Sequence, residues 1–216
     1  YLSQFGPYEF QPFSERETFE QEIAEKRRCL LVLSSWHYAK IHQEYRLRPV
    51  FVGSRSGKTS QKNLLVSGGA VDLAKVHEER IASASSEHYS KSLLSHILQN
   101  EALLPQLKIL TVPKDIDALM SLGFGMAKAA LTTDYSLNTL DTLNPALRKQ
   151  INILGQSEDT LLLIVAMTAE SVEVVQPLVT ILQEMPATPN GKKNMRMIGL
   201  DEWRPLTPSE IAKLEQ

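Results

Sequence analysis

Short apolar segments alternate with segments of helical spacing along this chain, and this alternation limits the folds that it can adopt. Residues 30–33, 49–53 and 161–167 have the length and apolar content of buried strands. Residues 85–99 and 174–185 carry apolar side chains three and four positions apart, as amphipathic helices do. Strands that alternate with helices over short links predict an α/β fold with mostly parallel sheets flanked by helices.

Local signals place the other elements. Further strands are expected at residues 8–10, 63–67, 80–84, 107–112, 127–131, 151–154 and 195–198, and helices at 14–28, 36–45, 115–122, 134–140 and 209–215, with a polar loop at 186–193. Ser14 is the expected N-cap of the first of these helices, with Glu17 completing a capping box, and Lys26, Arg27 and Arg28 are expected to close it. The last helix is expected to be capped from Thr207 or Ser209.

Composition narrows the classes of function. The 216 residues are 43% hydrophobic and carry a net charge of −2. A nucleic-acid partner is excluded as the main one, because neutralising phosphates requires a basic face. The apolar runs fall short of the roughly 18 residues that a membrane-spanning helix needs.

Two motifs of known chemistry are only approximated. The run from Gly53 to Thr59 resembles a phosphate-binding loop, but it has three residues between its glycines instead of four and leads into a predicted strand. The five histidines lack the spacing of a zinc site, so no metal and no cofactor are expected. Catalytic residues are not evident, so the sequence predicts that the protein is not an enzyme.

Three predicted strands end in small hydroxyl residues that lead into a helix. The turns are Ser34-Ser35-Trp36, Ser85-Ser86-Glu87 and Thr132-Thr133-Asp134. In an open sheet such turns lie at the carboxyl edge, where ligands bind, and helix N-termini there attract anions. The same residues are also the preferred N-caps of helices, so capping alone can explain any single turn. Three such turns in one chain predict that at least one of them faces a ligand.

Several segments together resemble the phosphate/phosphonate-binding proteins of ABC transporters, in the type II periplasmic binding protein family. The resemblance is carried by residues 80–87, 112–118, 123–127 and 130–133, and by a first-lobe pattern at 19–53 with its Ser-Trp-His-Tyr turn. It covers most of the chain in order and spacing. It implies a two-lobed fold with a ligand cleft between the lobes.

The resemblance also implies boundaries and a location. Lobe one would comprise residues 1–67 and 160–216, lobe two residues 68–159, and the chain would lack the usual N-terminal strand and helix of the family. The protein is expected to be a periplasmic monomer whose signal peptide has been removed. It would capture a small solute in the cleft, by a hinge motion, and deliver it to an inner-membrane transporter.

Carried over to this sequence, the oxyanion site of the family falls on Ser83, Ser85 and Ser86. Members of the family typically have a Ser/Thr-rich turn with a glycine there, and this chain has Glu87 and His88 instead. A carboxylate beside an anion site repels the anion, and this applies to Glu87 and, at the third turn, to Asp134. Other side chains expected at the ligand are Tyr8, Phe10, Trp36 and Tyr38 in lobe one and Tyr89 in lobe two. Their aromatic character leaves open an apolar ligand such as a lipid or sterol, and a different class of protein, an α/β enzyme or a sensor domain, also stays open.

Overall fold

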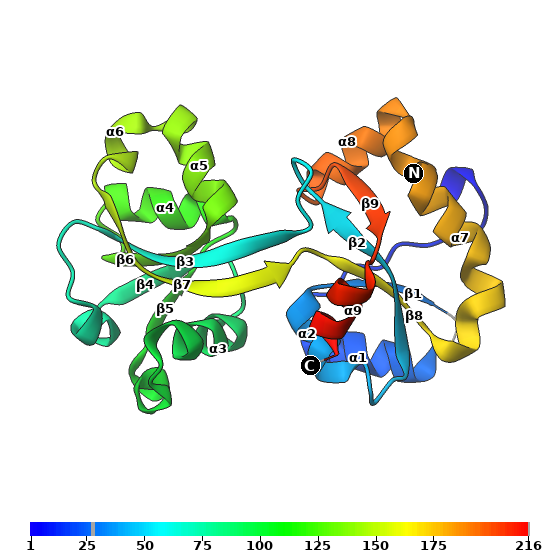
Figure 1. The fold of residues 1–216 in the computed structure, drawn as a ribbon, viewed down its shortest axis with the longest axis horizontal. Coiled ribbons are helices and arrows are strands. Elements are labelled where there is room, and N and C mark those ends of the chain that lie inside the picture. Colours follow the sequence, from blue (N-terminus) through cyan, green and yellow to red (C-terminus); the bar gives the residue numbers. More distant parts are fainter. Residues whose placement is uncertain (27–28, 216) are drawn as a thin grey trace. The chain divides into compact units, whose positions relative to one another are not determined.

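The chain forms two compact units in a computed structural model that describes residues 1–26 and 29–215. Unit 1 comprises Tyr1–Ser60 and Leu161–Gln216, and unit 2 comprises Gln61–Thr160 (Figure 1). The first boundary lies at 60/61, earlier than the expected 67/68, because almost all of the strand Ser60–Gly68 belongs to unit 2. The predicted helix closure by Arg27 and Arg28 lies outside the described residues.

Unit 1 is built on a four-stranded sheet in the order β1-β8-β2-β9. The strands are β1 (Leu30–Leu33), β2 (Leu47–Ser54), β8 (Ile164–Thr168) and β9 (Glu202–Pro205). Every pairing in it is antiparallel. Since β1 and β2 both run against β8, they run parallel to each other with β8 between them.

Helices cover both faces of this sheet (Figure 1). One face packs against α1 (Arg16–Glu25), α2 (Ser35–Ile41) and α9 (Pro208–Leu214), and the other against α7 (Val172–Glu184) and α8 (Pro189–Met197). Alternation along β8 supplies both cores: Ile164 and Ala166 enter the first, and Val165 enters the second. Short 3-10 turns lie at Leu2–Gln4, Ala169–Ser171 and Met185–Ala187.

Unit 2 is built on a five-stranded mixed sheet in the order β5-β4-β6-β3-β7. Its strands are β3 (Ser60–Gly68), β4 (Arg80–Ser83), β5 (Lys108–Thr111), β6 (Ala129–Thr133) and β7 (Ile151–Leu161). The neighbours β5, β4 and β6 run parallel, and β3 runs antiparallel to β6. Three strands of the unit thus end at one edge of the sheet, and β3 begins there.

Helices also cover both faces of the unit 2 sheet (Figure 1). α4 (Asp115–Gly123), α5 (Asp134–Leu143) and α6 (Pro145–Arg148) pack on one face, and α3 (Glu87–Leu98) packs on the other, where 3-10 turns at Leu73–Glu78 and Glu101–Gln106 complete the cover. The two faces of β6 separate cleanly, since Ala130 enters the α4 side and Leu131 the α3 side.

The α/β class is confirmed, but the prediction of mostly parallel sheets is wrong. Only the pairs β4–β5 and β4–β6 are parallel among the strand pairs whose direction is described. The short apolar run at residues 30–33 was expected to be a buried parallel strand. β1 instead lies at the edge of an antiparallel sheet, and Val32 is 36% exposed.

Several local predictions are also wrong. Residues 8–10 form no strand, and α1 begins after Glu15 without a side-chain cap, so the Ser14 capping box does not form. Residues 189–197 form α8 where a polar loop and a final strand were expected. The strand at 151 continues past Gly155 to Leu161. The predicted cap of α9 at Thr207 is confirmed, and it forms part of a capping box with Glu210.

Candidate functional site

The carboxyl edge of the unit 2 sheet gathers a group of hydroxyl and amide side chains. Ser83 ends β4, and Thr132 and Thr133 end β6. Asn63 lies opposite Thr133 in the antiparallel register, so the start of β3 reaches the same edge. Helices α3 and α5 begin there, directly after these strands. This edge is therefore the candidate ligand site of the unit.

The turn before α3 is held by serine hydroxyls. The Ser83 Oγ accepts hydrogen bonds from the Ser85 amide at 3.2 Å and from the Ser90 Oγ at 2.8 Å. The Ser86 Oγ caps the helix by accepting from the Tyr89 amide at 3.4 Å. The half-buried Ser85 hydroxyl has no hydrogen-bond partner among the residues that the structure describes. The Ser85 hydroxyl donor is therefore not engaged within this part of the chain.

Asn63 and Tyr89 connect the strand β3 to helix α3. Asn63 is 6% exposed, and its Nδ2 donates to the Thr160 Oγ1 at 3.2 Å. Burial raises the pKa of the Tyr89 hydroxyl, the hydrogen bond with the Asn63 side chain lowers it, and the nearby Asp115 raises it, with a net rise. Tyr89 is thus a neutral phenol at pH 7 that orients a buried amide at the site.

Two carboxylates that departed from the family pattern are compensated by neighbouring groups. Glu87 is paired with Lys91 at 2.7 Å, one helical turn further along α3. The Asp134 Oδ1 accepts from the Lys62 amide at 3.2 Å and from the Tyr135 amide at 2.9 Å. Both negative charges are partly neutralised within unit 2, so they oppose an anion less than the sequence suggested.

Helix capping accounts for one hydroxyl in each of the three turns. Ser34 accepts from the His37 amide, as Ser86 does from Tyr89, and Thr133 accepts from the Ser136 amide at 3.2 Å. The other hydroxyl of each turn differs. The Ser35 Oγ donates to the Leu161 carbonyl at 2.7 Å, whereas the Ser85 and Thr132 hydroxyls make no hydrogen bond to another described residue. Capping therefore does not account for the Ser85 and Thr132 hydroxyls.

The Thr132 hydroxyl is buried without a hydrogen-bond partner among the described residues, at 1% exposure. An unpaired buried hydroxyl costs about 1–3 kcal/mol. We therefore expect Thr132→Val, which keeps the shape, to raise the stability of unit 2 by about 1 kcal/mol. Thermal unfolding followed by circular dichroism measures this change, and Thr133→Val serves as the control.

The control is expected to behave in the opposite way. Thr133 caps α5 and also donates to the Ser136 Oγ at 3.1 Å, so its valine variant should lose stability. Equal losses in both variants would show that Thr132 is already satisfied in the folded protein.

The aromatic residues that were predicted to line the ligand in unit 1 differ in burial. Tyr38 is fully buried, its hydroxyl donates to the Leu47 carbonyl at 3.2 Å, and its ring stacks on His42 at 5.2 Å. Its place in the core contradicts the prediction that it lines a ligand. Phe10 is 70% exposed in an irregular segment, and Tyr8 and Trp36 are half-buried.

Sequence reasoning missed Asn63, Ser90 and Ser136, which complete the polar edge. Asn63 opens an apolar strand, and that isolated polar position was the available signal. Ser90 and Ser136 lie on the buried faces of amphipathic helices, at 0% and 9% exposure. Serine is mostly exposed in proteins, so a serine on the apolar face of a predicted helix was the available signal.

Two structural absences bear on the chemistry of the site. Among the described residues, no group of three or more histidine, cysteine, aspartate or glutamate side chains is arranged to hold a metal ion. None of the helices in the same part of the chain has the length and apolar content to cross a membrane.

The two α/β units, each a sheet covered by helices on both faces, define the class of two-lobed periplasmic binding proteins. The model of the family described as ABC transporter, phosphonate, periplasmic substrate-binding protein matches residues 6–211. The chain belongs to this family, which is a family of transport proteins and not of enzymes. A search of curated proteins finds no match.

Solved structures share the fold at low sequence identity. XAC2383 from Xanthomonas citri, bound to ATP, is 12% identical with a TM-score of 0.70, over 99% of this chain and 86% of that one. A binding protein component of an ABC phosphonate transporter from Pseudomonas aeruginosa, PA3383, is 12% identical with a TM-score of 0.63, over 92% and 71%. PhnD1 from Prochlorococcus marinus, in complex with methylphosphonate, is 8% identical with a TM-score of 0.60, over 95% and 84%.

Proposed function

We propose that this protein binds a small phosphorus oxyanion, a phosphonate or phosphate, at the carboxyl edge of the unit 2 sheet. Acting as a monomer in the periplasm, it would deliver this ligand to an inner-membrane ABC transporter. The observation that carries the proposal is the turn before α3, where the Ser85 hydroxyl has no partner among the described residues and lies directly before the N-terminus of a 12-residue helix. Tetrahedral oxyanions bind to such arrays of donors.

The donors available at this turn match an oxyanion. α3 spans 12 residues, and the capping bond of Ser86 satisfies only the Tyr89 amide. The Glu87 amide lies at the first position of the helix, where helical hydrogen bonding leaves N–H groups for an external acceptor. The positive end of the helix dipole adds to the attraction.

The ligands of the neighbouring structures support the oxyanion class. PhnD1 is in complex with methylphosphonate, and XAC2383 is bound to ATP. Both ligands carry negatively charged oxygens on phosphorus. The apolar alternative has less support from unit 1, since Tyr38 belongs to the core.

Calorimetric titration with methylphosphonate and with inorganic phosphate tests the proposal. Ser85→Ala is expected to weaken binding about 10-fold or more, because it removes one donor to a charged acceptor. Folding should not change, since the Ser85 hydroxyl has no partner among the described residues. Ser95→Ala is the matched control: Ser95 lies on the same helix, and its Oγ donates to the Ser92 carbonyl at 2.8 Å.

Two results would contradict the proposal: no binding of either ligand to the wild type, or binding of both variants with the affinity of the wild type. The same samples serve for small-angle scattering. Hinge closure of the two units over the ligand, which is part of the proposal, predicts a smaller radius of gyration when the ligand is present.

A further inference from the structure

Helix α8 places three cations on the surface of unit 1 within two helical turns. Lys192, Lys193 and Arg196 are exposed, and Pro189–Met197 contains no acidic residue. Within residues 1–26 and 29–215, none of the three forms an ion pair with a carboxylate. Their charge is therefore available to an anionic partner.

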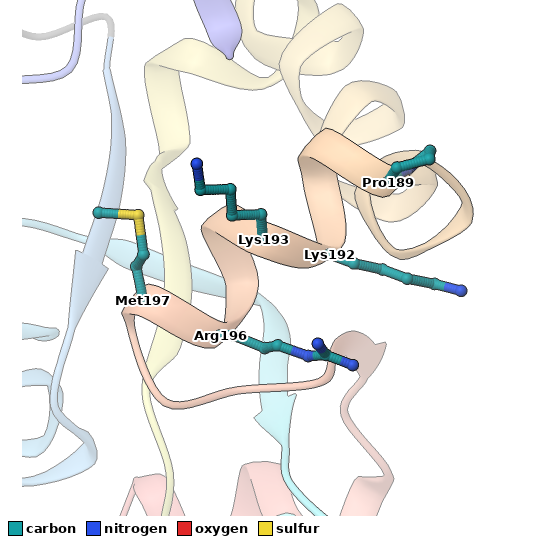
Figure 2. Close-up of a pocket in the computed structure, with 5 residues that line it drawn as sticks. All are labelled: Pro189, Lys192, Lys193, Arg196 and Met197. Carbon is teal, nitrogen blue, oxygen red and sulfur yellow. The ribbon is translucent and has the colours of Figure 1, made fainter.

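The orientation of α8 turns these cations towards solvent. Gly191 and Met195 are buried and hold the opposite side of the helix against the core of unit 1. Lys192 and Arg196 point to one side of the exposed surface, and Lys193 and Met197 point to the other (Figure 2). Together with Pro189 they border a surface hollow of about 520 Å³.

Large apolar side chains lie next to the cations. Met197 is 76% exposed and Ile198, directly after the helix, is 43% exposed. Exposed apolar side chains beside lysine and arginine are typical of segments that lie at a lipid–water interface, where the cations contact headgroups and the apolar groups enter the boundary below. An acidic protein segment would match the cations but would not require Met197 and Ile198.

We propose that this face of α8 binds anionic lipid headgroups and holds the protein at a membrane surface. The net charge of the whole chain is −2, so attraction to an anionic surface depends on a local basic face such as this one. The proposal does not depend on the phosphonate ligand. It concerns residues of unit 1 that take no part in the unit 2 site.

The expected size of the effect follows from the charges. Each cation near an anionic membrane increases binding about fivefold at low salt. Removing two cations is therefore expected to lower the partition coefficient about 25-fold. At 1 M salt the screening length falls to about 3 Å, so most of the electrostatic attraction should disappear.

Vesicle sedimentation of the ligand-free protein tests the proposal. The protein is expected to bind vesicles of equal parts phosphatidylglycerol and phosphatidylcholine, and to bind pure phosphatidylcholine vesicles at least tenfold more weakly. The double variant Lys192→Ala/Arg196→Ala should show the 25-fold loss. Lys75→Ala/Lys149→Ala removes the same charge from exposed lysines of unit 2 and should change binding less than about twofold.

Met197→Ser separates the apolar contribution from the electrostatic one, with an expected loss of about threefold that remains at high salt. Equal binding to both vesicle types, or equal losses in both double variants, would overturn the proposal. So would binding of a hexaglutamate peptide to the α8 face without any binding to vesicles, which would assign the face to an acidic protein segment. A failure here with intact phosphonate binding leaves the proposed transport function in place.

Discussion

Replacing Gly191 with alanine is expected to destabilise unit 1 by about 3 kcal/mol or more. A Cβ at this position of α8 would lie 1.9 Å from the Met185 carbonyl oxygen and 2.7 Å from its carbon. These are backbone atoms, so relief requires α8 to move away from the turn before it. That movement would also strain the Thr188 cap, whose Oγ1 accepts from the Gly191 amide at 3.0 Å.

Thermal unfolding measures this effect as a fall of roughly 6–12 °C in the midpoint of unit 1. Gly123→Ala is the matched control, because Gly123 also lies in a helix and its added Cβ would meet only the Leu147 side chain, at 3.2 Å. A leucine tip can shift, so the control should change stability by less than about 1 kcal/mol. Similar losses of stability in both variants would show that the contact with the Met185 backbone is not the cause of the loss in Gly191→Ala.

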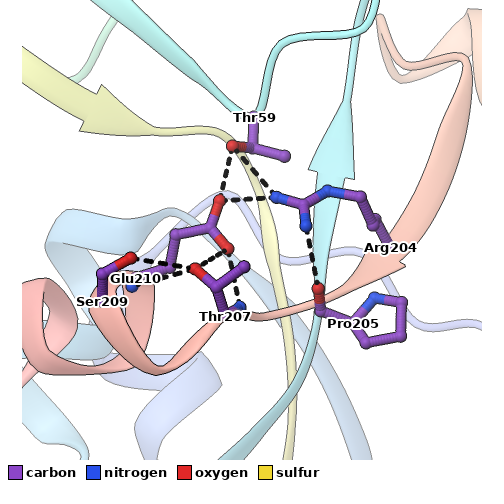
Figure 3. A network of polar contacts seen from close by, with 6 residues as sticks. All are labelled: Thr59, Arg204, Pro205, Thr207, Ser209 and Glu210. Atoms are coloured by element: carbon purple, nitrogen blue, oxygen red, sulfur yellow. Dashed lines mark hydrogen bonds and ion pairs between the residues drawn. The ribbon is translucent and has the colours of Figure 1, made fainter.

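The second large effect is expected at Glu210, whose carboxylate accepts four hydrogen bonds (Figure 3). Its Oε1 accepts from the Thr59 Oγ1 and from the Arg204 Nη2, both at 2.6 Å. Its Oε2 accepts from the Thr207 amide and from the Thr207 Oγ1, both at 2.8 Å. Burial raises the pKa of Glu210, but these donors together with the Arg204 charge outweigh it and lower the pKa below its ordinary value.

A lowered pKa means that the folded state favours the charged carboxylate. Its stabilising effect is present above the pKa of the unfolded chain, near 4.3, and is lost as the pH falls through the lower pKa of the folded state. We expect Glu210→Gln to cost about 2–3 kcal/mol at pH 7, because it leaves Arg204 unpaired and exchanges an acceptor for a donor. The difference from the wild type should shrink below about pH 4.

Urea unfolding at a series of pH values measures this dependence. Glu202→Gln serves as the control. Glu202 is exposed on β9, the strand that also carries Arg204, and the substitution removes the same charge. A stability difference for Glu210→Gln that stays constant from pH 7 to pH 3 would contradict the assignment. Since Thr59 immediately precedes Ser60, where the first segment of unit 1 ends, the network also fixes the chain at the unit boundary.

The sequence predicted element type best where the hydrophobic period was long and regular. The helix at Glu87–Leu98 and the strand at Arg80–Ser83 were placed within a few residues. Strand direction was not predictable, because an apolar run such as Leu30–Leu33 has the same pattern in parallel and antiparallel sheets. The run at residues 161–167 concealed a junction, since β7 ends at Leu161 and β8 begins only at Ile164.

Helix α8 was missed because its buried face is small. Gly191 and Met195 are its buried residues, and the rest of Pro189–Met197 is polar or proline apart from the exposed Met197. Such a segment has the composition of a loop, and tertiary packing together with the Thr188 cap makes it a helix. At the candidate site, the hydroxyl turns were visible in the sequence, but the place of Asn63 beside them was not, since it depends on pairing with a strand 70 residues away at Thr133.

The arrangement of strands in unit 1 has a consequence for the order in which the chain folds. β1 and β2 both take β8 as their neighbour, and the other partner of β2 is β9, near the end of the chain. During synthesis, the strands of unit 1 remain unpaired until the whole of unit 2 has emerged. Unit 2 is continuous in sequence and can form its parallel core first. We therefore expect unit 1 to fold more slowly than unit 2, because its strand pairs are far apart in the sequence. Until β8 is synthesised, β1 and β2 stay unpaired, and their edges need protection from aggregation.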